Sequence, residues 1–137
     1  MGKIVWHLLS NRWNSAITEY ALSVARSLDL VGGKSIFTPL AASPAEGRAK
    51  KHLDTRSAQG FGLRDLPELL ATARDIAPDT IVTYGGPETF LAKALKRVTG
   101  ARVVRFRGQA LEAEGLAYSL RHKIAHAHVD LILTPSE

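Results

Sequence analysis

The chain has 137 residues, of which 45% are hydrophobic and 23% charged, a composition typical of one globular domain rather than of a disordered chain. The absence of cysteine excludes a disulfide framework, a cysteine-ligated zinc site and thiol catalysis. The formal net charge of +5 favours an anionic partner, such as nucleic acid, anionic lipid or a phosphorylated small molecule.

The predicted elements alternate between strand and helix along the chain. Short apolar runs rich in β-branched and aromatic residues predict strands, and longer segments with apolar residues at helical spacing predict helices. In chain order these are the strand Lys3–Leu9, the helix Ser15–Leu28, the strand Lys34–Leu40, the helix Asp65–Ile76, the strand Thr80–Tyr84, the helix Pro87–Thr99, the strand Arg102–Phe106, the helix Leu116–Ala127 and the strand Asp130–Thr134. Residues 41–63, which are poor in large apolar side chains, predict a mobile loop with a short helix and a marginal edge strand.

Residues at the helix ends support these boundaries. Ser15 or Asn14 can cap the first helix. Pro87 suits the first position of the third helix, and Glu88 lies in its first turn, where the helix dipole favours negative charge. Gly100 follows that helix as a C-cap. The buried stripes are expected at Ile17, Ala21, Val24 and Leu28 in the first helix and at Leu91, Ala94, Leu95 and Val98 in the third.

This order of elements predicts an α/β fold. We expect an open, doubly wound, mostly parallel sheet of the Rossmann-like kind, in three layers α/β/α. No linker or internal repeat divides the sequence, so residues 1–137 are expected to form a single domain. Ligands of such sheets bind outside the carboxyl ends of the strands, at the point where the strand order reverses.

Two loops are expected to face each other at this switch point. They are "SNRWNS" (10–15), after the first strand, and "YGGPE" (84–88), after the third. Each precedes a helix N-terminus with unpaired N–H groups, which suits a small anionic or hydroxylated ligand. The predicted substrate-binding residues are Asn11, Arg12, Trp13, Asn14, Tyr84, Gly85, Gly86, Glu88, Arg107 and Gln109.

Several of these residues have a second interpretation. Arg12 either binds an anion or is a solvated surface residue, and Trp13 either stacks on a flat or sugar ring or is half-buried. Gly85-Gly86 either approaches a ligand closely or forms a tight strand-to-helix turn that needs positive φ. Arg105 lies inside an apolar strand, which is costly unless it is paired or reaches water, so it either points to solvent at an edge or has a binding function. Arg107, just past the end of that strand, can bind a phosphate or carboxylate bidentately.

The sequence assigns no catalytic residue and predicts neither a metal site nor a cofactor. His122 and His126 share a helix face, but no third ligand and no HExxH pattern accompanies them. Neither GxGxxG after the first strand nor GxxxxGK[ST] is present, and "GFGLRD" (60–65) is only GxGxxD after no clear strand. A standard NAD or ATP site is therefore unsupported.

The basic stretch "RAKKHLDTR" (48–56), together with Lys93, Lys96 and Arg97, is either a solvated surface or a surface for anionic lipid. No nucleic-acid-binding motif accompanies the charge, which argues against a nucleic-acid partner. No apolar run approaches the roughly 20 residues of a membrane span. We therefore expect a cytoplasmic protein, with peripheral binding to the inner face of the membrane as an alternative.

Read as a whole, the chain resembles the N-terminal, acceptor-binding half of a GT-B glycosyltransferase of family 4. The resemblance rests on "KIVWHLLSNRWNSAITEYALSVARSL", on "APDTIVTYGGPETFLAKALKRVTGARVVRFRGQ" and on "AHVDLILTPSE". It implies a bacterial enzyme of two domains, in which a C-terminal domain holds a nucleotide-sugar and the sugar passes to a glycan or lipid-linked acceptor in the cleft. Because the donor-binding half would be absent, we expect no activity from these residues alone.

The chain departs from the family pattern at two places. The loop "SNRWNS" lacks the glycine that usually approaches the donor phosphate, and Arg107 stands where the family often has a histidine. Two other functions therefore stay open: a non-catalytic α/β module for a phosphorylated or sugar ligand, and a domain that mainly associates with partner chains. An apolar face exposed on the last strand would favour a homodimer.

Overall fold

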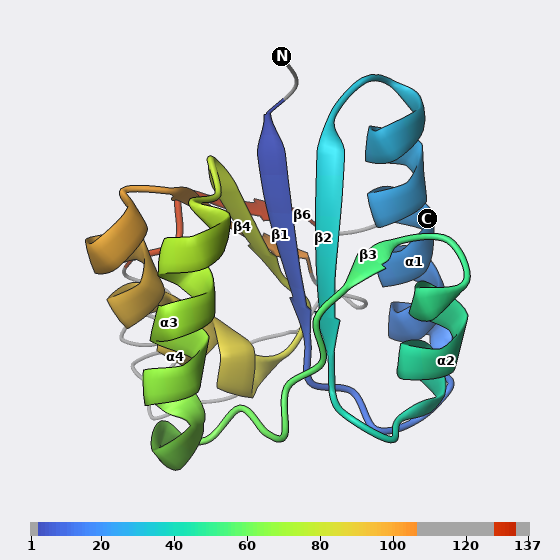
Figure 1. The fold of residues 1–137 in the computed structure, drawn as a ribbon, viewed down its shortest axis with the longest axis horizontal. Coiled ribbons are helices and arrows are strands. Elements are labelled where there is room, and N and C mark those ends of the chain that lie inside the picture. Colours follow the sequence, from blue (N-terminus) through green and yellow to red (C-terminus); the bar gives the residue numbers. More distant parts are fainter. Residues whose placement is uncertain (1–2, 107–127, 134–137) are drawn as a thin grey trace, which may run out of the picture.

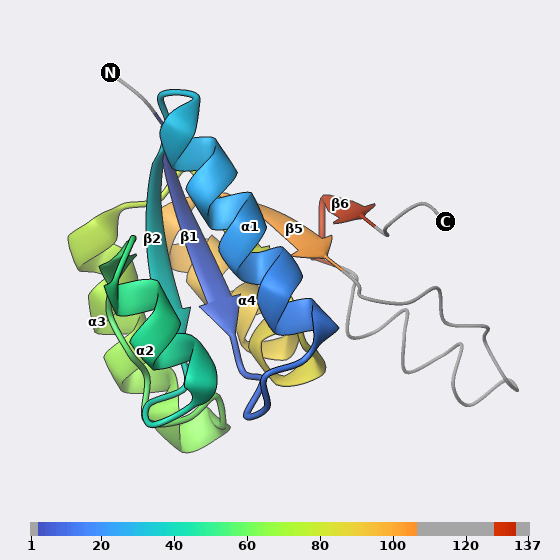
Figure 2. The same ribbon diagram turned by 90° about the vertical axis from the view of Figure 1, so that its right-hand side faces the viewer.

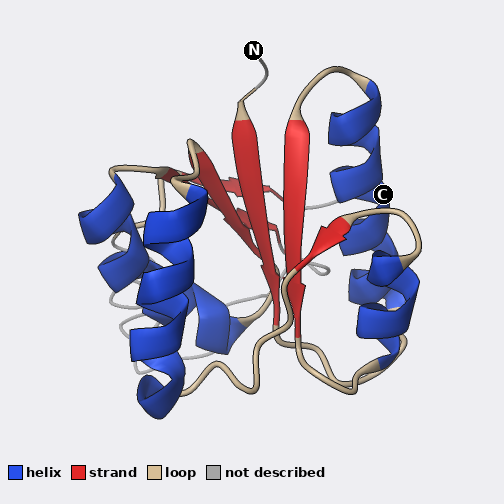
Figure 3. Cartoon of the chain, in the orientation of Figure 1, coloured by secondary structure: helices blue, strands red, loops and turns tan. Residues whose placement is uncertain are grey.

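The computed structural model describes residues 3–106 and 128–133, which form a parallel sheet between two layers of helices (Figures 1 and 3). In this part of the chain the strand order is β3-β2-β1-β4-β5-β6, and all the pairs are parallel. The strands are β1 (Ile4–Leu9), β2 (Lys34–Pro39), β3 (Asp54–Thr55), β4 (Thr80–Thr83), β5 (Arg102–Phe106) and β6 (Leu131–Leu133). The helices are α1 (Ala16–Leu30), α2 (Pro44–Lys50), α3 (Leu66–Ile76) and α4 (Gly86–Thr99), with a 3-10 turn η1 (Leu63–Asp65). The predicted Rossmann-like sheet is confirmed, and its order reverses between β1 and β4.

The helices divide the core into two parts. α1 and α2 cover one face of the sheet and α3 and α4 the other (Figures 1 and 2). Trp6 and Leu8 pack towards α3 and α4, whereas Leu9 packs towards α1 and α2. This alternation is the period of a β-strand. Since both faces are covered, the strands read as continuous apolar runs rather than as alternating ones.

The segment between β2 and α3 contains the predicted short helix, α2, and the predicted edge strand, β3. Its last residues are also joined to the sheet. Ala58 N donates to Pro39 O at 2.9 Å, and Ala41 N donates to Ala58 O at 2.8 Å. Phe61 is buried against the α3 side of the core. These contacts bring residues 59–62 to the carboxyl edge of the sheet.

The buried stripes of two helices differ from the predicted ones. Val98 in α4 is exposed and Ile17 in α1 is only partly buried, whereas Thr18 and Thr89 are fully buried. The Thr18 hydroxyl donates to Trp13 O at 2.8 Å, and the Thr89 hydroxyl donates to Gly85 O at 2.6 Å. A polar side chain whose hydrogen bonds are made locally can lie in a core. The buried face of α1 is therefore rotated towards Thr18, and that of α4 towards Thr89. The buried residues are Thr18, Ala21, Leu22 and Ala25 in α1 and Glu88, Thr89, Leu91, Ala92 and Leu95 in α4.

The predicted C-cap of α4 is confirmed, since Gly100 has a left-handed φ of 71°. Ser15 is the N-cap residue of α1, but its hydroxyl forms no capping bond to the helix. It accepts a hydrogen bond from Asn11 Nδ2 instead, at 2.6 Å. The predicted helix Leu116–Ala127 lies outside the described residues.

His7 lies fully buried in β1, within a hydrogen-bonded chain across the sheet. Ser35 Oγ donates to Ala25 O at 2.8 Å, so it accepts from His7 Nε2 at 3.1 Å. His7 Nδ1 then accepts from the Tyr84 hydroxyl at 2.9 Å. This arrangement requires the neutral imidazole. Burial correspondingly lowers the pKa of His7 to about 3 and raises the pKa of Tyr84.

We predict that His7 makes the fold sensitive to acid. The pKa of His7 is lowered from 6.5 by folding, so below pH 6.5 the unfolded chain binds the proton more tightly than the folded one. The free energy of unfolding should have its full value above this pH, and it should fall by about 2 kcal/mol between about pH 7 and about pH 5. Urea unfolding followed by circular dichroism across this range measures the slope.

The matched control is His52, an exposed histidine just after α2. His7→Gln should lose most of the slope, whatever its absolute stability, whereas His52→Gln should keep it. An unchanged slope in His7→Gln would contradict this role of His7.

Candidate functional site

The loops after β1 and β4 meet at the carboxyl edge of the sheet, as predicted, and Glu88 joins them. Glu88 Oε2 accepts a hydrogen bond from Ser10 N at 2.7 Å. The side chain has no exposed surface. Burial raises the pKa of Glu88, and this rise is opposed by hydrogen bonds from its own N–H and from Ser10 and by the charge of Arg105. Glu88 therefore links the two loops through a buried hydrogen bond.

Gly85 leaves room for that carboxylate. A Cβ atom on Gly85 would lie 2.6 Å from Glu88 Oε1 and 2.8 Å from Ser10 Oγ. The φ of Gly85 is −135°, which any residue adopts, and the described glycines with positive φ are Gly32 and Gly100. The expectation that this turn needs positive φ is therefore wrong. Gly86 is exposed, and a Cβ atom there would have nothing within 4 Å.

Arg105 is hydrogen-bonded within the protein, as an arginine inside an apolar strand requires when it does not reach water. Its Nη1 donates to Gly85 O and, at 2.6 Å, to Thr89 Oγ1. The Thr89 hydroxyl also lies 2.7 Å from the Thr83 hydroxyl. These bonds join the first turn of α4 to β4 and β5. The start of α4, next to the switch point, is therefore held in place by a charged side chain and hydrogen bonds as well as by apolar packing.

Asn11 organises the loop after β1. Its Oδ1 accepts from Trp13 N at 3.0 Å, and its Nδ2 donates to Thr18 Oγ1 at 3.2 Å as well as to Ser15. Asn14 Oδ1 accepts from Arg48 Nη1 at 2.9 Å. Arg12 and Trp13 project outwards, and Trp13 is 74% exposed, so the alternative of a half-buried tryptophan is wrong.

Among the other predicted binding residues, Tyr84 belongs to the core. Its hydroxyl is bonded to His7, and its ring centroid lies 5.8 Å from that of Phe106. Arg107 and Gln109 lie outside the described residues, as do His122 and His126. Across residues 3–106 and 128–133, no group of three His, Asp or Glu side chains could hold a metal ion.

A groove of about 470 Å³ opens beside the loop after β1, on the α3 and α4 side of this edge. A volume of this order is typical of small-molecule sites. Ser10 and Arg12 line it from the loop after β1, Leu40 and Ala41 from the chain after β2, and Pro87 from the start of α4. The full lining is Ser10, Arg12, Leu40, Ala41, Gln59, Gly60, Phe61, Gly62, Arg64, Asp65 and Pro87. The segment 59–65 was missed as a site in the sequence, because no strand directly precedes its GxGxxD pattern.

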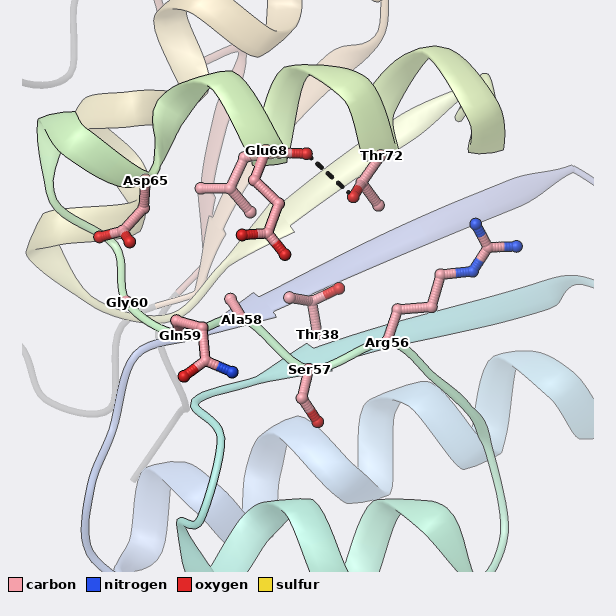
Figure 4. A pocket seen from close by; sticks show the side chains of 10 residues that line it. Thr38, Arg56, Ser57, Ala58, Gln59, Gly60, Asp65, Glu68 and Thr72 are labelled. Atoms are coloured by element: carbon pink, nitrogen blue, oxygen red, sulfur yellow. Dashed lines mark hydrogen bonds between the residues drawn. The ribbon is translucent and has the colours of Figure 1, made fainter.

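Asp65 shapes the wall formed by this segment. Its Oδ2 accepts from Gly62 N at 3.0 Å, and a Cβ atom on Gly60 would lie 2.6 Å from the same oxygen. Figure 4 shows Asp65, Gly60 and Gln59 around a smaller adjoining cavity between α3 and residues 56–60. The glycines and the aspartate of GxGxxD thus stabilise a loop. Their spacing was the signal in the sequence that could have identified the groove wall.

The basic residues do not form one surface. Residues 48–50 lie in α2 and Lys93, Lys96 and Arg97 in α4, on opposite faces of the sheet (Figure 2). Arg48 pairs with Glu19, Arg56 with Asp75, and Lys96 with Asp130 at 2.7 Å. The single lipid-binding surface expected from these residues together is therefore wrong. Within the described ranges, no helix is long and apolar enough to cross a bilayer.

The outer side of α4 carries a separate, mostly apolar cavity of about 270 Å³. Leu63 and Phe90, which are 69% and 56% exposed, line it together with Lys93 and Arg97. Neither cation forms an ion pair with another described residue. On this face, therefore, exposed apolar side chains and basic side chains lie side by side.

Solved structures with a similar fold include enzymes of sugar transfer. The chain matches MurG of Acinetobacter baumannii with a TM-score of 0.72 and 12% identity, over 98% of this chain and 43% of that one. It matches the spinosyn rhamnosyltransferase SpnG, solved with thymidine diphosphate, with a TM-score of 0.67 and 15% identity, over 97% of this chain and 45% of that one. It also matches MT0777, with a TM-score of 0.67 and 10% identity, over 98% of this chain and 86% of that one.

Neither a protein-family model nor a curated protein matches the sequence. At these identities the structural matches show the fold alone. The chain spans less than half the length of MurG and SpnG, and it spans most of MT0777. The fold is therefore found both as part of a glycosyltransferase and as most of a chain.

We predict that the two adjacent glycines differ sharply in their tolerance of a methyl group. Gly85→Ala should destabilise the fold by about 1–3 kcal/mol, because Glu88 is fully buried and cannot move aside without losing its bond to Ser10. Gly86→Ala should change stability by less than about 0.5 kcal/mol, because the new methyl group has open space. Urea unfolding midpoints of the two variants provide the comparison, and equal midpoints would argue against the packing role of Gly85.

Proposed function

We propose that this chain is the acceptor-binding domain of a GT-B glycosyltransferase resembling family 4, and that its groove receives the acceptor. The observation that carries this proposal is the groove of about 470 Å³ at the switch point of the sheet. That is where parallel α/β sheets bind their ligands. The shared fold with MurG and SpnG supports the choice of sugar transfer over other chemistries of Rossmann-like sheets.

In this proposal the groove and the loop beside it offer a sugar two kinds of contact. Ser10 and Gln59 present a hydroxyl and an amide at the lining, which can exchange hydrogen bonds with sugar hydroxyls. Trp13, next to Arg12 and largely exposed, offers an aromatic face for stacking on a sugar ring. The acceptor is a glycan or a lipid-linked sugar.

The remaining parts of the reaction belong to a partner. A C-terminal donor-binding domain would hold the nucleotide-sugar, which is a substrate of the complete enzyme rather than a cofactor. The apolar and basic face of α4 at Phe90, Lys93 and Arg97 is the surface that we propose for peripheral contact with an anionic membrane at its cytoplasmic side. The exposed side chains of β6 (Leu131–Leu133) are the proposed contact for a homodimer.

We expect residues 1–137 alone to show no turnover of nucleotide-sugar. Departure of the nucleoside diphosphate requires positive groups or a metal to stabilise its charge, and in this proposal the donor domain supplies them. Release of nucleoside diphosphate from a panel of nucleotide-sugars, in the presence of mixed glycan and lipid acceptors, measures the activity. Robust turnover by these residues alone would refute the assignment of a purely acceptor-binding role.

The second candidate is a non-catalytic module that binds a phosphorylated or sugar ligand. Its support is the match to MT0777, in which this fold accounts for most of the chain. The DNA beyond codon 137 and in the neighbouring genes discriminates between the two. A donor-type α/β domain encoded there, which restores transfer when combined with this chain, favours the glycosyltransferase. A stop codon without such a neighbour favours the module.

A further inference from the structure

We infer that the groove selects a ligand that carries a phosphate group, held between Arg12 and Arg64. The inference rests on the proposed role of the groove as an acceptor site, and it narrows the acceptor to the phosphorylated class. A phosphate group on a soluble sugar and one on a lipid carrier share this chemistry.

Arg12 and Arg64 reach the groove from different elements. Arg12 comes from the loop after β1, which lies beside Glu88 and the start of α4, whereas Arg64 comes from η1, in the chain that leads to α3. Both side chains are exposed. A ligand in the groove can therefore meet a guanidinium group from each of two walls.

In the part of the chain that the structure describes, neither arginine forms a side-chain hydrogen bond. Among residues 3–106 and 128–133, neither Arg12 nor Arg64 takes part in an ion pair, whereas Arg48, Arg56 and Arg105 hold structural partners. A guanidinium group offers a planar fork of N–H donors that matches phosphate oxygens bidentately. The two arginines of the groove thus keep this capacity for a ligand.

The acidic groups nearby are engaged within the protein. Asp65, the one carboxylate among the lining residues, accepts from Gly62 N and packs against Gly60. Glu88 is buried beneath the switch point and bonded to Ser10. The lining therefore carries two cations, Arg12 and Arg64, and one anion, Asp65, whose carboxylate is already hydrogen-bonded within the protein. A phosphate group can accept charge-assisted hydrogen bonds from both guanidinium groups, whereas a neutral sugar offers them only uncharged acceptors.

The test measures binding by isothermal titration calorimetry to the whole chain, with four probes. Glucose 1-phosphate and glucose differ by the phosphate on a soluble sugar, and farnesyl phosphate and farnesol in detergent micelles differ by the phosphate on a lipid. We expect at least one phosphate to bind and its neutral counterpart to bind much more weakly. Added salt should weaken the binding, because the two arginines are exposed to screening.

Substitutions then assign the binding to the two arginines. Arg12→Gln and Arg64→Gln should each weaken the affinity about tenfold, the usual effect of losing one charge-assisted contact. Arg12→Lys and Arg64→Lys should fall between wild type and the glutamine variants, because the charge stays and the fork is lost. The control is Arg74→Gln, at an exposed position in the last turn of α3, which should bind like the wild type. Circular dichroism confirms that each variant is folded.

The outcomes separate cleanly. Binding of glucose 1-phosphate alone indicates a soluble acceptor, binding of farnesyl phosphate alone indicates a lipid carrier, and either result supports the inference. Equal binding of phosphorylated and neutral probes, no binding of either phosphate, or equal losses in all the glutamine variants would overturn it. Phosphate binding without transfer in the complemented assay would reject the glycosyltransferase and keep the phosphate site. Transfer to an unphosphorylated acceptor without phosphate binding would do the reverse.

Discussion

The geometry of the candidate site depends on one buried carboxylate. Glu88 lies at the point where the strand order reverses, and it bonds to the backbone of the loop that follows β1. Burial raises the pKa of this acid, and the hydrogen bond from Ser10 N–H and the charge of the neighbouring Arg105 offset that rise only in part. Because the same side chain fills the space over Gly85, separation of the two loops would break its bond to Ser10 N–H and undo this packing.

The arginines around this site and on the outer surfaces differ in whether they have partners within the protein. Arg105 serves the fold, since it bonds to Gly85 O and Thr89 in the same corner of the structure. Arg48 and Arg56 are neutralised on the outer surfaces. Arg12 and Arg64 keep their full donor capacity at the groove. Two of the cations that give the sequence its net positive charge therefore stand at one edge of the sheet, where we infer that a phosphate group binds.

The sequence predicted the layers, the described strands and the ends of α3 and α4 to within a residue, because apolar periodicity and glycine or proline signals are local. The end of α1 was predicted two residues too early, at Leu28 instead of Leu30. It failed where the hydrogen bonds of polar side chains decide. The polar Thr18 and Thr89 are buried because the backbone of the preceding loop satisfies them, which no hydropathy pattern reveals. Segment 59–65 joined the site only through the contacts of Ala58 and Phe61 with the sheet and the core. Glu88 was expected at a helix start, but its bond to Ser10 spans 78 positions and could not be read from neighbours.

The two glycine–carboxylate contacts also suggest how this groove can be recognised in other sequences. Gly85 with Glu88 follows the spacing G-x-x-E, and Gly60 with Asp65 follows G-x-x-x-x-D. In each pair the acid occupies the volume that a side chain on the glycine would need. The two positions should therefore vary together through evolution: a bulkier residue at the first should accompany a shorter or neutral residue at the second. We therefore expect covariation of the two residues of each pair in related sequences, rather than conservation of either residue.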